Sequence, residues 1–161
     1  MSRKPGLFVK EPNRKPPFKE LDHTADLRIE IVGRDEPELF RNAVDSLYVL
    51  LGVPVASHHS GLREVDKLRI LGRDPEESLV QLLGELLYRA TVERQQLILG
   101  TLSVRRGGEG GGVCEVLVTG RWRTLHDEEM LDKREIKAVT YHNVEIRRTR
   151  KGFSARLVMD T

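Results

Sequence analysis

A helix-start signal occurs twice in this sequence, each time after a short stretch rich in apolar residues. The first copy is Gly33-Arg34-Asp35, and the second is Gly72-Arg73-Asp74, 39 residues further along. In both copies a glutamate follows the aspartate by three residues, which is the spacing of an N-cap residue and its partner in a capping box. A proline lies in the first turn of each predicted helix. The repeat predicts two units in which a strand turns directly into a helix. We interpret it as reuse of a good start signal rather than as a duplication.

Apolar spacing assigns the rest of the chain to helices and strands. Leu27, Ile29 and Ile31 alternate as in a strand, while apolar residues at helical spacing fill 39–51 and 79–87. Stretches 97–105 and 113–122 flank a glycine-rich segment, which predicts a hairpin. Two further alternating stretches end the chain. The order predicts an α+β fold: a two-layer α/β sandwich with one mostly antiparallel sheet and two helices on one face.

Length and composition narrow the class of protein. The chain has 161 residues, of which 39 % are hydrophobic and 32 % charged, as in a globular domain. It contains no apolar run of the roughly 20 residues that cross a bilayer, so no membrane association is expected. The single cysteine, Cys114, cannot form an internal disulfide. These features favour a cytoplasmic protein.

The first seventeen residues differ in composition from the rest. They contain five basic residues, one acidic residue and four prolines. We therefore expect a flexible basic arm over 1–17 and a folded domain over 18–161. The arm is either a solubilising tail or a segment that touches RNA or an acidic partner.

Common catalytic and metal-binding patterns are absent from the sequence. There is no Gly-x-Ser-x-Gly elbow and no His-Glu-x-x-His pair. The adjacent His58 and His59 are interpreted as exposed loop residues. Asp127-Glu128-Glu129 lacks the spacing of a calcium loop and is interpreted as a solvated turn.

Three polar motifs remain as candidate sites. Asp22-His23-Thr24-Ala25-Asp26 either caps a turn or offers carboxylates to a hard cation. Asp160 lies beside the terminal carboxylate of Thr161, and two such negative groups repel unless a cation lies between them. Lys137-Ala-Val-Thr-Tyr-His142 is either a strand with one wet face or a functional motif.

Together these motifs resemble the archease family. The resemblance rests on His23-Thr-Ala-Asp26, on Lys137-Ala-Val-Thr-Tyr-His142, on Asp160 near the end, and on Leu86-Leu87-Tyr88 in the second helix. It covers about Phe18 to Thr161. It implies a non-catalytic activator of the GTP-dependent RNA ligase of tRNA splicing, which promotes ligase guanylylation and multiple turnover. The protein would contact RNA indirectly, through that ligase.

The resemblance also implies site residues. Asp26, Asp160 and Thr161 would bind a divalent cation, calcium in the family, and Lys137 would support ligase activation. Asp22, His23 and His142 are candidates for supporting roles. The basic arm and the predicted pI of about 8.8 depart from the family pattern. A stand-alone metal-dependent phosphatase or nuclease and a general RNA-binding chaperone stay open as alternatives.

Overall fold

The computed structural model describes residues 17–21, 26–54, 66–109, 112–130 and 135–161. Ordered along the chain, the elements are β1 (Phe18–Leu21), β2 (Leu27–Gly33), α1 (Glu36–Leu50), β3 (Asp66–Gly72), α2 (Pro75–Thr91), β4 (Gln95–Arg106), β5 (Cys114–Thr124), the short 3-10 helix η1 (Asp127–Met130), β6 (Ala138–Thr149) and β7 (Gly152–Asp160). The expected arm over 1–17 and the His58-His59 pair lie outside the described residues, apart from Pro17. No helix of the described segments is long and apolar enough to cross a membrane.

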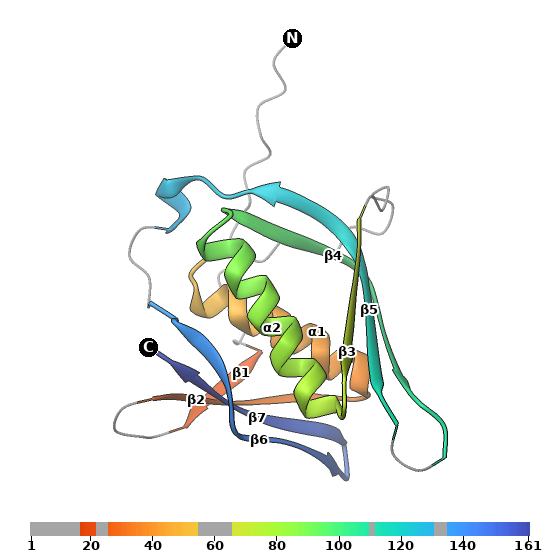
Figure 1. Cartoon of the computed structure of the whole chain (residues 1–161). Helices are drawn as coiled ribbons and strands as arrows, with labels where there is room; N and C mark the ends of the chain where they lie inside the picture. The colour runs from red at the N-terminus through yellow and green to blue at the C-terminus, as the bar shows by residue number, and fades with distance from the viewer. Residues whose placement is uncertain (1–16, 22–25, 55–65, 110–111, 131–134) are drawn as a thin grey trace.

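The strands form two sheets with the helices between them (Figure 1). One sheet has the order β1-β2-β7-β6 and the other β3-β5-β4, and every pairing is antiparallel. Helix α1 contacts β1, β2 and β7 of the first sheet and β4 of the second, while α2 contacts β6 and all three strands of the second. The α+β class with two helices and antiparallel strands is confirmed. The strands nevertheless divide into two sheets rather than one.

The helices explain the second sheet. The buried side of α2 is wide and comprises Ser78, Leu79, Val80, Leu82, Leu83, Leu86, Leu87 and Ala90. A single sheet can cover one side of such a helix, and the remaining apolar side needs another layer. The two sheets and both helices therefore share one continuous hydrophobic core.

The repeated signal gives the same turn twice. The carboxylate of Asp35 accepts the Glu38 N–H at 2.8 Å, and that of Asp74 accepts the Glu77 N–H at 2.7 Å. Each glutamate reaches back to the N–H of the preceding arginine rather than to that of the cap. A Cβ on Gly33 or Gly72 would overlap the first turn of the following helix. Both predicted helix starts are confirmed.

Strand β6 departs from regular pairing. Thr140 pairs with Val158 and Glu145 with Arg156, so four residues of β6 lie opposite Leu157 alone. Within this bulge Asn143 has a φ of 55°, in the left-handed region that asparagine tolerates better than most residues. Such bulges re-aim side chains and often lie beside functional sites.

Candidate functional site

Three polar motifs that are distant in sequence meet at one end of the β1-β2-β7-β6 sheet. The central strand β7 pairs Met159 with Leu27 of β2 and Asp160 with Ala138 of β6. Asp26 directly precedes Leu27, so the same register places it opposite Asp160. Figure 1 shows the C-terminus beside the start of β6. The sheet thus brings together the ends of all three motifs.

Lys137 is tied to this end by its backbone. Its N–H donates to the carbonyl oxygen of Asp160 at 2.8 Å. Lys137, Asp160 and Thr161 are exposed, and Asp26 is half-buried. The ammonium group and the chain end are therefore accessible to a partner.

The donor set at this end fits a hard cation. Asp26 and Asp160 supply two side-chain carboxylates, and Thr161 directly follows Asp160. Carboxylate oxygens are the ligands that calcium and magnesium prefer, whereas zinc sites use histidine and cysteine. Among the described residues no three His, Cys, Asp or Glu side chains form a group that could hold a metal ion. Asp22 and His23 lie outside the described residues.

His142 is placed further away. It is exposed and lies within the bulge, four residues along β6 from the partner of Asp160. Thr140 is the last residue of β6 that pairs with β7 before the bulge, so the sheet register does not place His142 beside the two carboxylates.

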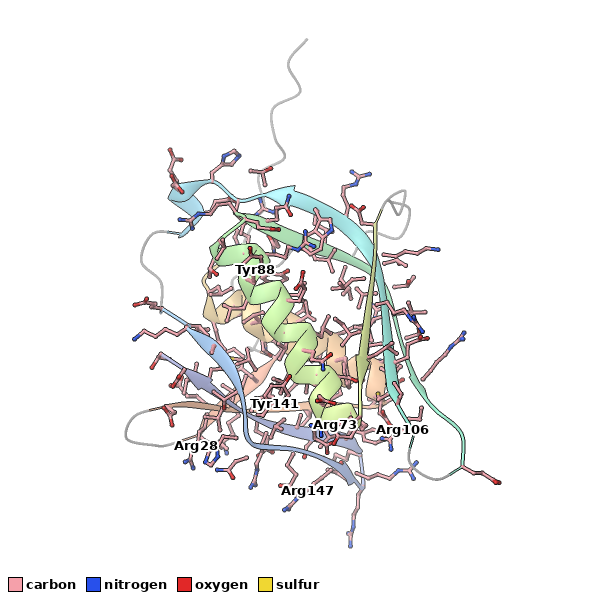
Figure 2. All side chains as sticks on the ribbon, in the orientation of Figure 1. Arg28, Arg73, Tyr88, Arg106, Tyr141 and Arg147 are labelled. Carbon is pink, nitrogen blue, oxygen red and sulfur yellow. The ribbon has the colours of Figure 1, made fainter. Side chains whose placement is uncertain are left out.

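Arg28 was not singled out from the sequence, although its position gives a signal. It follows Asp26 by two residues and pairs with Val158, so it shares one face of the sheet with Asp26 and Asp160. Figure 2 shows Arg28 on the side of the sheet away from the helices. The signal in the sequence is the two-residue spacing, because residues two apart in a predicted strand lie on the same face of the sheet.

The lone cysteine does not have the setting of a nucleophile. Cys114 is 1 % exposed, and burial raises the pKa of its thiol despite a nearby hydrogen bond from Ser78. Its backbone carbonyl accepts the Ser78 hydroxyl at 2.8 Å. Cys114 is a core residue at the junction of β5 and α2.

The profile of the archease protein family matches residues 18–161. The chain belongs to the archease family. Protein archease of Archaeoglobus fulgidus is 31 % identical over 143 residues, covering 89 % of this chain and 98 % of that protein. Protein archease of Methanosarcina barkeri is 29 % identical over 144 residues, covering 89 % and 94 %.

Solved structures share the fold of this archease family member. The solution structure of Methanobacterium thermoautotrophicum protein 1598 aligns with a TM-score of 0.63 at 23 % identity, covering 91 % of this chain and 100 % of that one. A Thermotoga maritima archease, described as a possible chaperone, aligns with a TM-score of 0.51 at 20 % identity, covering 92 % and 98 %. The resemblance drawn from the motifs is confirmed at the level of family and fold.

Proposed function

We propose that this archease is a non-catalytic, metal-binding activator of the GTP-dependent RNA ligase of tRNA splicing. It would promote guanylylation of the ligase and so its repeated turnover, and it would meet RNA through the ligase. The observation that carries the proposal is the convergence of Asp26, Lys137 and Asp160 on one exposed sheet end. A single buried cysteine suits the reducing cytoplasm in which such a protein would work.

The chain's own residues suggest how it would act. Asp26, Asp160 and the terminal carboxylate of Thr161 would hold a divalent cation, for which calcium is the first candidate. Such a cation, when bound, neutralises charge on phosphate groups. The backbone of Lys137 is hydrogen-bonded to Asp160, so the Lys137 ammonium would add a second positive charge close to the cation. Pairing of β7 with strands on both sides fixes the position of Asp160 before any partner arrives.

The direct test measures guanylylation. Ligase would be incubated with labelled GTP, with or without this protein, and the covalent ligase–GMP adduct would be counted. We expect the parent protein to raise the rate of adduct formation and Asp26→Asn to lose most of that effect. Equal rates with and without the parent protein would contradict the proposal.

A stand-alone phosphatase or nuclease would use the same carboxylates. This alternative predicts that the pure protein releases product from RNA or nucleotides when a divalent cation is added. Asp26→Asn would abolish the release. We expect no metal-dependent product from the parent protein in the absence of ligase.

A general RNA chaperone is the other alternative, and the Thermotoga maritima relative is described as a possible chaperone. It predicts RNA binding that weakens steeply with salt and disappears when residues 1–17 are removed. The activator proposal predicts that this truncation leaves ligase stimulation nearly unchanged. The two results separate the functions.

A further inference from the structure

A hollow of about 500 Å³ lies against the β1-β2-β7-β6 sheet, and its lining includes Arg28, Arg156 and Val158, which alternate with core residues and so lie on the face turned away from the helices. The described residues that line it come from all four strands and are Leu21, Arg28, Ile29, Asn143, Val144, Glu145, Arg156, Leu157 and Val158. The volume is in the range of small-molecule sites, about 300–1,000 Å³. None of the motifs used above accounts for this hollow.

The bulge in β6 builds one wall. Three extra residues opposite β7, together with the left-handed Asn143, bring Asn143 and Val144 into the lining. The opposite wall consists of Leu21 and Arg28, which are paired across β1 and β2. Val158 lies between the walls and is only 5 % exposed, although it shares the outward face with Arg28. The hollow therefore has an apolar floor.

Among the described residues around the hollow, one cation has no ion-pair partner. Glu145 lies 2.6 Å from the Arg147 guanidinium, and Arg156 lies 3.5 Å from the Glu30 carboxylate. Arg28 forms no ion pair with another of the described residues and is exposed. The described lining residues thus carry two guanidinium groups and one carboxylate; the carboxylate is paired with Arg147 and one guanidinium, that of Arg156, with Glu30.

Strand register sets the spacing of the two guanidinium groups. Arg28 pairs with Val158 and Arg156 with Glu30, so the arginines are diagonal neighbours on adjacent strands. Diagonal positions lie about 7–8 Å apart, within reach of two long side chains converging on one group. A phosphate has enough acceptor oxygens to bind two guanidinium groups at once, whereas the two oxygens of a carboxylate are satisfied by a single guanidinium group. The apolar floor suits the sugar or base of a nucleoside.

We propose that this hollow binds a nucleoside phosphate, with Arg28 as the main phosphate contact and Arg156 as the second. Asp26 precedes Arg28 by two residues and Asp160 follows Val158 by two, so the bound phosphate would lie beside the carboxylate end. The site is assigned from the hollow and its charges alone. If the hollow bound no phosphate, the ligase proposal would still stand. If the protein did not stimulate the ligase, the hollow could still bind phosphate.

The test is an amide NMR titration of the full chain in metal-free buffer, repeated with calcium. The probes are GMP, guanosine and pyrophosphate. We expect GMP and pyrophosphate to shift the signals of residues 143–145 and 156–158, and guanosine to bind at least tenfold more weakly. Arg28→Gln should weaken GMP binding by roughly tenfold or more, the loss expected for one charge-assisted contact.

Arg121→Gln is the matched control, because Arg121 is an exposed strand arginine in the other sheet. It should bind GMP as the parent does. A dinucleotide with a 3′-phosphate, compared with its 3′-hydroxyl form, tells whether an RNA end is also accepted. Equal binding of GMP and guanosine would overturn the proposal, as would unchanged affinity in Arg28→Gln. Binding of a glutamate-rich peptide at these residues in place of the phosphates would overturn it too.

Discussion

The backbone N–H of Lys137 donates to the carbonyl oxygen of Asp160 at 2.8 Å, which joins the lysine motif of residues 137–142 to the end of β7. Lys137 lies one residue before β6, and Asp160 is the last residue of β7. The bond uses only main-chain atoms, so it survives replacement of either side chain. Substitutions at these two positions therefore change the chemistry of the site while the sheet that presents it stays in place.

Replacing Lys137 with alanine should reduce ligase stimulation with little effect on folding. The side chain is exposed, so the free energy of unfolding should change by no more than about 0.5 kcal/mol. Lys137→Arg keeps the charge but alters its geometry and should restore part of the stimulation. Thermal melts and ligation rates on both variants check this. Full stimulation by Lys137→Ala would remove the lysine from the mechanism.

A tag fused to the C-terminus should weaken calcium binding, because it converts the terminal carboxylate of Thr161 into a neutral amide. Hard cations lose affinity when an anionic oxygen is replaced by a weaker ligand. Isothermal titration with calcium should show the same loss for Asp160→Asn, whereas an N-terminally tagged protein should bind like the parent. Melting temperatures without metal should stay close to the parent value. Unimpaired binding by the C-tagged protein would exclude the terminal carboxylate as a ligand.

Acid should weaken the two helix starts. Hydrogen bonds from the Arg34 guanidinium and N–H hold the pKa of Glu38 below its ordinary value of 4.5, and Arg73 does the same for Glu77. A carboxyl with a lowered folded-state pKa stabilises the protein above the unfolded value and loses that contribution as pH falls through the folded one. Unfolding of the parent and of the double variant Glu38→Gln/Glu77→Gln should be compared from pH 6 to about pH 3. The stability advantage of the parent should shrink on acidification, and a constant gap would contradict the assignment.

Cys114 should be protected from thiol reagents in the folded protein. It is almost fully buried, and burial raises the pKa of the thiol, so little thiolate is available near neutral pH. A chromogenic disulfide reagent should label it slowly in buffer and fully in denaturant. Rapid stoichiometric labelling of the native protein would show that the junction of β5 and α2 opens readily.

Local signals in the sequence were sufficient for the helices and most strands. Asp35 and Asp74 mark both helix starts, because cap spacing is a short-range property. The division into two sheets depends on long-range pairing, such as that of β2 with β7, which alternation alone does not specify. The sequence alone indicated the motifs around Asp26, Lys137 and Asp160. That they meet at one end of a sheet follows from the order of the strands, which the sequence did not predict. The bulge around Asn143 and the partners of Arg28 were invisible for the same reason.

Turnover of the ligase tests the central proposal most directly. A limiting amount of ligase would receive excess RNA with 2′,3′-cyclic phosphate and 5′-hydroxyl ends, together with GTP and a divalent cation. Joined RNA molecules per ligase would be counted with no addition, with the parent protein, with Asp26→Asn and with Asp127→Asn. Asp127 is an exposed aspartate in η1, which follows β5 of the other sheet, and serves as the control. We predict many turnovers with the parent and the control, and about one turnover without addition or with Asp26→Asn. The same number of turnovers with and without the parent protein would contradict the account.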